Sequence, residues 1–157
     1  GLDAQKQAAT EIALLFIDGE KLEEVGRYES YISPYLKEYQ QAALDYTGIT
    51  MEKLESKGKP LGVVMKEVVA WIKEMREKDG TTSHTKKPVL VGHNPLFDIS
   101  FLEENAKETK TDLTTILNGS RKGFGTKYVF KLRLNRYSTF KTQRIPPLKC
   151  FLKVGSS

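Results

Sequence analysis

One carboxylate stands where a strand is expected to give way to a helix. Val89–Val91 is a short apolar run typical of a central strand, and Asn94-Pro95 is a helix cap followed by the residue best tolerated at a first helical position. Asp98 then falls in the first turn of the predicted helix. Because ligands of an open α/β sheet collect at the carboxyl ends of its strands, Asp98 is a candidate working carboxylate. The helix dipole alone would also favour an acid there, so a structural role stays open.

The elements that must position this residue are predicted from turn signals and periodicity. The apolar run Thr10–Ile17 stops at Asp18-Gly19, which favours a tight turn and predicts a strand hairpin with a second strand over about residues 21–32. From Leu61 to about residue 78, apolar residues recur at spacings of three and four, which predicts an amphipathic helix. Tyr128–Asn135 alternates apolar and polar residues, as a half-buried strand does.

Two weaker signals lie between these elements. Residues 35–46 space their apolar side chains only loosely at helical intervals, so the prediction is a short helix or an ordered loop. Thr50 can cap a following helical turn, Met51–Glu55, through its hydroxyl.

Composition suits a single domain of 157 residues, and no run is long enough to span a membrane. Together with a lone cysteine, Cys150, this favours a cytoplasmic protein that does not associate with membranes. The net charge of +5 is unevenly distributed: residues 1–106 hold 13 Lys and Arg against 18 Asp and Glu, whereas residues 107–157 hold 12 against 2. An acidic body with a basic, phosphate-seeking end is one interpretation, and a merely solvated basic tail is the other.

Two segments together resemble the DnaQ-like (DEDD, RNase T-like) 3′-5′ exonuclease family. Tyr46–Thr50 (YTGIT) is similar to the T-G-I-T turn of the family, and Gly92–Asp98 (GHNPLFD), followed by Phe101-Leu102, is similar to its second motif. The resemblance covers roughly residues 1–104. It implies a ribonuclease H-like mixed sheet flanked by helices, truncated at the first strand and atypical at the C-terminal end. The expected organisation is an incomplete exonuclease-like domain, 1–127, and a basic segment, 128–157.

The resemblance also implies a chemistry. Two Mg²⁺ or Mn²⁺ ions would hydrolyse phosphodiester bonds at the 3′ end of a single strand, DNA rather than RNA, with a DNA polymerase subunit as a further expected partner. Asp98 would be the metal ligand of the second motif. The residues expected to bind substrate are Thr47, Gly48, Ile49, His93, Asn94 and Phe97.

The sequence departs from the family pattern at both ends. The D-x-E of the first motif would precede residue 1, and no Asp, Glu or His follows Asp112, so one of four expected metal ligands is present. We therefore expect weak or absent metal binding and an impaired enzyme, because Mg²⁺ gives up its waters reluctantly to a single carboxylate. A non-catalytic nucleic-acid-binding domain with the same fold, and a small α/β interaction domain with neither role, are the alternatives.

Overall fold

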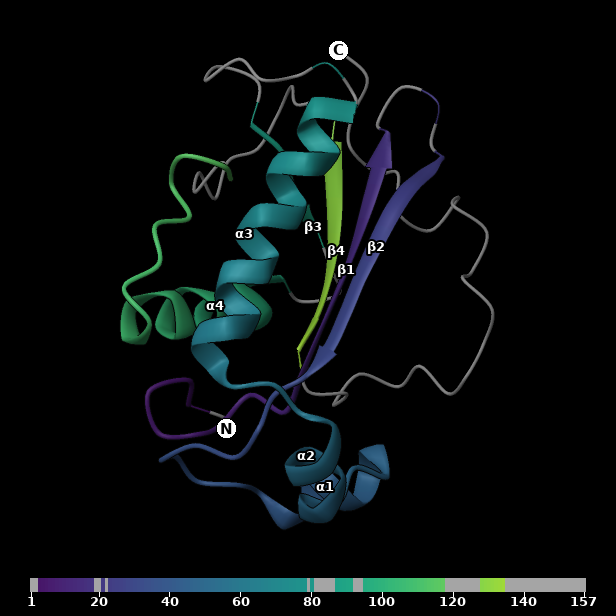
Figure 1. Cartoon of the computed structure of the whole chain (residues 1–157). Coiled ribbons are helices and arrows are strands. Elements are labelled where there is room, and N and C mark those ends of the chain that lie inside the picture. The colour runs from purple at the N-terminus through teal and green to yellow at the C-terminus, as the bar shows by residue number, and fades with distance from the viewer. Residues whose placement is uncertain are drawn as a thin grey trace.

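The computed structural model of the chain describes residues 3–18, 21, 23–78, 80, 87–91, 95–117 and 128–134. In chain order its elements are β1 (Glu11–Asp18), β2 (Glu24–Tyr31), α1 (Gln41–Thr47), α2 (Met51–Lys57), α3 (Leu61–Lys78), β3 (Val89–Val91), α4 (Pro95–Glu108) and β4 (Tyr128–Leu134) (Figure 1). The strands form one sheet with α3 and α4 packed beside it, which confirms the predicted α/β class. In these ranges no helix has the length and apolar character needed to cross a bilayer.

The predicted strand hairpin is confirmed. β1 and β2 pair antiparallel with Glu11 opposite Tyr31, and the tip of the turn between them lies outside the described residues. Every second side chain of β1 is buried, among them Ile12, Leu14 and Phe16, because successive residues of a strand point to opposite faces of the sheet. The period of the apolar residues therefore decides which face of β1 meets the helices.

The sheet is mixed, with the strand order β2-β1-β4-β3. β4 pairs antiparallel with β1 along its whole length and parallel with β3. The prediction of Val89–Val91 as a central strand is wrong for the described sheet, because β4 lies between β1 and β3 and leaves β3 at the end of the strand order. A three-residue apolar run gives no information about the neighbours of a strand.

The C-terminal strand predicted over Tyr128–Asn135 is confirmed over Tyr128–Leu134. Because β4 hydrogen-bonds to β1 and β3, the sheet continues across the predicted boundary at residue 127. That boundary stays a prediction, and the segment that follows β4 lies outside the described residues.

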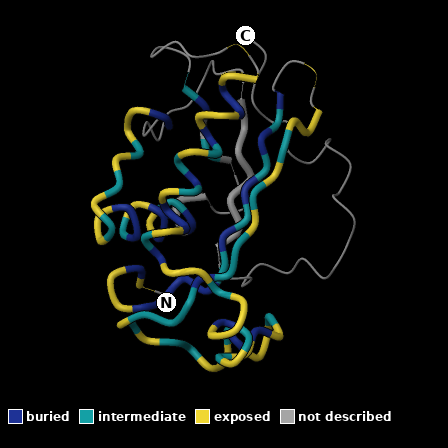
Figure 2. Tube along the Cα trace, viewed as in Figure 1, coloured by how far each residue is buried: buried dark blue, intermediate teal, exposed yellow. Residues whose placement is uncertain are grey.

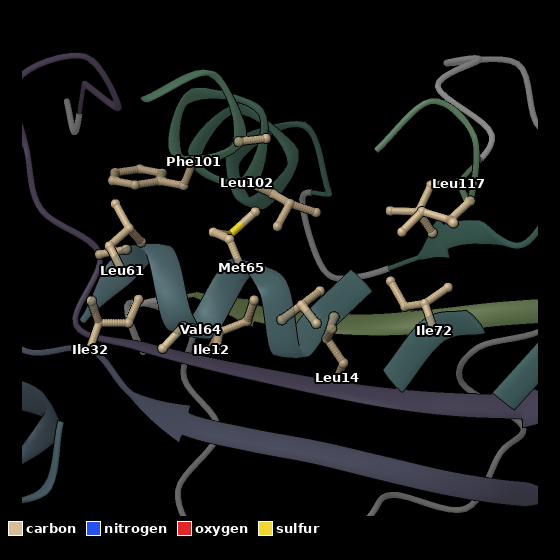
Figure 3. Close-up of a cluster of buried hydrophobic side chains, with 14 of the residues drawn as sticks. Ile12, Leu14, Ile32, Leu61, Val64, Met65, Ile72, Phe101, Leu102 and Leu117 are labelled. Atoms are coloured by element: carbon tan, nitrogen blue, oxygen red, sulfur yellow. The ribbon is translucent and has the colours of Figure 1, made fainter. Parts of the chain in front are cut away.

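Both helices contact the sheet, α3 at β2 and α4 at β3 and β4, and side chains of α3, α4 and the sheet together build the main hydrophobic core (Figure 3). The apolar residues predicted to line one face of α3 are all buried, which confirms the prediction: Leu61, Val64, Met65, Val68, Ile72 and Met75. Phe101 and Leu102 of α4, each 1% exposed, reach the same core from the other side. Each such side chain contributes roughly 1.5–3 kcal/mol by leaving water.

The prediction of a short helix or an ordered loop over residues 35–46 is confirmed, because the segment contains a loop followed by a helix. Helix α1 begins at Gln41, and the residues before it form no helix. Thr50 caps α2 as predicted, because its hydroxyl accepts a hydrogen bond from the Lys53 amide at 3.1 Å. We call residues 41–57, which contain both helices, the helical hairpin. It lies beyond the ends of the strands, apart from α3 and α4 (Figure 1).

Candidate functional site

The turn between α1 and α2 contains three of the predicted binding residues. Helix α1 ends at Thr47, and Gly48 adopts the left-handed conformation with φ 68°. The Thr47 hydroxyl lies 3.0 Å from the carbonyl oxygens of Ala43 and Leu44, and it accepts a hydrogen bond from the Ile49 amide at 3.3 Å. The turn is therefore fixed by bonds within a few residues of itself.

Gly48 and Ile49 face different surroundings. A side-chain carbon added to Gly48 would meet no atom within 4 Å, so the space beside its backbone is open. Ile49 is 4% exposed and packs with Leu44 and Leu54 in a second hydrophobic cluster. The backbone at Gly48 is thus accessible to a ligand, and the buried side chain of Ile49 fixes the turn to the small hydrophobic cluster.

Two pockets border this turn. One lies between α1 and the residues that precede β1, and Thr47 lines it together with Thr10 and Tyr39. The other is a more open depression between α1 and α2, and Gly48 and Ile49 line it. The side chain of Thr47 and the backbone of Gly48 thus border neighbouring hollows rather than a single cavity.

Asp98 lies in the first turn of α4, after the carboxyl end of β3, as predicted. It is 8% exposed and has at least one interaction partner within the fold. Its carboxylate is therefore not directed into bulk solvent. The positive end of the helix dipole favours a negative charge at this position.

The structure brings some of the predicted site residues together. Thr47, Gly48 and Ile49 are adjacent, but neither pocket that they line includes Asp98. His93 and Asn94 lie outside the described residues, and so does the side chain of Phe97. That these residues form one site with Asp98 stays a prediction.

The described side chains do not fit a two-metal centre. Within the described part of the chain, no three His, Cys, Asp or Glu side chains lie close enough together to hold a metal ion. The strand β4 occupies the middle of the sheet and its sequence contains no Asp or Glu. Because Mg²⁺ and Mn²⁺ need several oxygen ligands, Asp98 alone is insufficient, and no hydrolytic step through metal ions follows from this donor set.

Sequence reasoning missed a polar network beside the first pocket. The Tyr35 hydroxyl accepts a hydrogen bond from the Ala9 amide at 2.7 Å, and the Tyr39 hydroxyl accepts one from the Tyr35 amide at 2.9 Å. Burial raises the pKa of both phenols, so both stay protonated at neutral pH. Residues 33–40 form neither helix nor strand, so no periodic signal in the sequence could have revealed the network.

A partly buried ion pair links the same segment to α4. The ammonium of Lys37 lies 2.6 Å from a carboxylate oxygen of Glu108 and donates to the Ala4 carbonyl oxygen at 2.7 Å. The Lys37 side chain is 7% exposed. The segment that leads into the helical hairpin is thus tied to both the N-terminal residues and α4.

Comparison of the chain with models of known protein families and with curated proteins gave no match. The resemblance to the DnaQ-like exonucleases therefore rests on the two motifs and on the elements that contain them.

Proposed function

We propose that this chain is a 3′-5′ exonuclease-type domain, ribonuclease H-like in fold, that binds the 3′ end of a single nucleic acid strand, DNA rather than RNA. The observation that carries the proposal is the turn at Gly48. Its left-handed backbone, with open space beside it, is followed by a helix that Thr50 caps. A glycine in this conformation leaves its backbone accessible to close approach by a ligand such as a terminal nucleotide.

The position of Asp98 supports the same proposal. Asp98 is a residue 8% exposed in the first turn of the helix after β3, and ligands of α/β folds bind at the carboxyl ends of the strands. In the proposed family, divalent metal ions would supply the activated water and stabilise the leaving oxygen. Asp98 would contribute one ligand to them. The other ligands would have to come from outside the described residues.

Binding without hydrolysis is the second candidate function, and the position of β4 favours it. This inner strand of the sheet has Lys131 and Arg133 in its sequence and no acidic residue. By register, Lys131 stands opposite Leu15 and Arg133 opposite Ala13. Lys and Arg suit phosphate neutralisation rather than metal binding.

End recognition is tested by competition. A 5′-labelled single-stranded oligonucleotide should bind the chain at low salt, and affinity measured by fluorescence anisotropy should fall as salt rises. An unlabelled linear strand should compete, and a circular single strand of equal length should compete much more weakly because it has no 3′ end. Equal competition by the circle would refute end recognition. Absence of any affinity at low salt would refute both candidate functions.

Hydrolysis is tested separately with the same labelled strand and Mn²⁺. If the domain is an enzyme, shortening of the strand from its 3′ end should be lost in Asp98→Ala and retained in Glu103→Ala, a matched control at an exposed acid of the same helix. If the domain only binds, the strand stays intact and affinity is the same with and without Mn²⁺. A polymerase subunit as partner and a cytoplasmic location remain predictions.

A further inference from the structure

The helical hairpin has a hydrophobic core of its own. Leu44, Ile49 and Leu54 are its buried members, and Tyr31, Tyr39 and Met51 pack against them. The main core draws its buried residues from the segments before and after, and none of them lies in residues 41–57. Much of the hairpin is exposed, whereas buried residues recur at short intervals along the whole of β1 and α3 (Figure 2). The chain thus builds two cores of very different size.

Two anchors fix the chain just outside the hairpin. Before it, Glu38 forms an isolated bridge with Gln7, with the Glu38 amide donating to Lys6 and its carbonyl accepting from Ala8, each at 2.9 Å. After it, the Lys59 amide donates to the Tyr31 carbonyl at 3.0 Å, and the Lys59 carbonyl accepts from Ser33 at 2.9 Å.

The exit from the hairpin is also tightly packed. A side-chain carbon at Gly58 would lie 2.5 Å from the Ser33 amide nitrogen, so the backbone there sits directly against the end of the strand region. Backbone hydrogen bonds thus fix residues 38 and 59 to neighbouring segments on either side of the hairpin.

The contact between the hairpin and the sheet is slight by comparison. The Lys53 ammonium lies 4.7 Å from the ring centre of Tyr31, and both Tyr31 and Tyr39 cover the small core. On the remaining side, Ala43 and Thr47 face the residues before β1 across the first pocket, which no side chain fills. Because no buried side chain of the main core lies in residues 41–57, separation of the hairpin from the sheet would leave that core intact and would cost less free energy than its loss.

From these observations we propose that residues 41–57 form a separate cooperative unit, which opens and unfolds while the sheet, α3 and α4 stay folded. The motion would open the wall of the pocket that Thr47 lines. That a nucleic acid end closes the unit is a consequence that rests on the proposed function, whereas the opening itself does not.

Native-state hydrogen exchange of the whole chain tests the proposal, with Leu14→Ala as the deciding variant. Leu14 is 1% exposed in the main core. Its truncation should speed exchange of the slowest amides of β1 and α3 by on the order of 100-fold. Amides of residues 41–57 should keep their rates, because they exchange through an opening in which the main core stays intact. An equal acceleration in both regions would overturn the proposal.

Leu54→Ala is the matched reciprocal variant, since it removes the same atoms from a side chain that is 0% exposed in the small core. It should bring residues 41–57 close to the exchange rate of an unstructured peptide. Hydrogen exchange of the β1 and α3 amides should speed up by no more than the protection factor that the hairpin had before the substitution. The reason is that the variant already has an open hairpin in its most populated state, so global unfolding loses only the stability of the hairpin. Greater acceleration of β1 and α3 would contradict a separate unit.

Two further measurements do not depend on the stability of these variants. Ile12→Val, a milder truncation in β1, should show the same asymmetry with a rise of about 3- to 10-fold in β1 and α3. In the unmodified chain, exchange of residues 41–57 should depend weakly on urea because little surface is exposed by their opening. A urea dependence as steep as that of α3 would refute the proposal.

The effect of a nucleic acid strand distinguishes this proposal from the proposed function. If a single strand fails to slow hydrogen exchange in residues 41–57, the result counts against the proposed function and does not affect the proposal of a separate unit.

Discussion

The two halves of the candidate site are held in place by different means. Asp98 lies one turn before Phe101 and Leu102, which are buried between α4 and α3 in the main core. Residues 47–49 lie in a turn whose bonds are local, on a hairpin with three buried apolar side chains. The position of the Asp98 carboxylate thus depends on contacts between segments distant in the sequence, whereas the conformation of the turn depends on bonds among adjacent residues.

This difference separates fold stability from site geometry. A substitution next to Asp98 acts through the main core and so affects the whole molecule. A substitution in the turn acts first on the hairpin. If one ligand contacts both the turn and Asp98, it contacts one region stabilised by local bonds and one stabilised by the main core. Its binding would then couple the stabilities of the two regions.

Phe101→Ala should have the largest effect, because it removes a side chain that is 1% exposed and leaves a cavity between α3 and α4. We expect the free energy of unfolding to fall by about 3–5 kcal/mol. Urea denaturation, monitored by circular dichroism, measures the change in the free energy of unfolding. Leu36→Ala is the control, since this leucine is fully exposed and its loss should change stability by less than about 0.5 kcal/mol. Similar effects of the two variants would show that α4 is not seated in the main core.

Gly48→Ala should have an intermediate effect confined to the hairpin. With φ 68° and no neighbour within 4 Å, the cost is purely conformational, about 1–2 kcal/mol. Gly62→Ala is the matched control, because a side chain there also meets nothing but the backbone of α3 accepts it, so it should stabilise by about 0.5 kcal/mol. The free energy of unfolding, measured by urea denaturation, should therefore fall in Gly48→Ala and rise in Gly62→Ala relative to the unmodified chain. If Gly48→Ala is neutral, the turn does not hold the conformation on which the proposed function depends.

Short-range signals in the sequence predicted much of this fold. The apolar spacing from Leu61 predicted α3, and the Thr50 hydroxyl and Asn94-Pro95 predicted where α2 and α4 begin. Such features depend on a few adjacent residues, so a single sequence contains them. The turn at Gly48 belongs to the same class.

Long-range features could not be predicted in the same way. The pattern of Tyr128–Leu134 predicted a strand, but its place between β1 and β3 depends on pairing across more than one hundred residues, since Tyr128 stands opposite Asp18. The contacts of Tyr35 and Lys37 arise in a segment without periodicity, where only the tertiary fold selects their partners. The residues that surround Asp98 are likewise selected by the tertiary fold. A role for Asp98 could therefore be predicted from the sequence, but its neighbours could not.

The smallest effect is expected at the junction of the two regions, where Glu67 of α3 accepts hydrogen bonds from Lys59, which follows the hairpin, and from Tyr28 of β2. These bonds lower the pKa of Glu67, with the Lys59 bond contributing most. A lowered folded-state pKa gives stability that is present above the unfolded-state pKa, near 4.3, and is lost as pH falls through the folded-state value. Because the pair is largely exposed, the loss should be only about 0.2–0.5 kcal/mol.

Urea midpoints between pH 6 and pH 3 measure this contribution by difference. In Glu67→Gln the midpoint should already be lower at pH 6, and the gap from the unmodified chain should narrow as pH falls below about 4. Glu74→Gln is the control, because Glu74 pairs with Lys78 within α3 and does not touch the junction. If the gap for Glu67→Gln is independent of pH, or if Glu74→Gln reproduces it, the junction does not couple the two regions through this carboxylate.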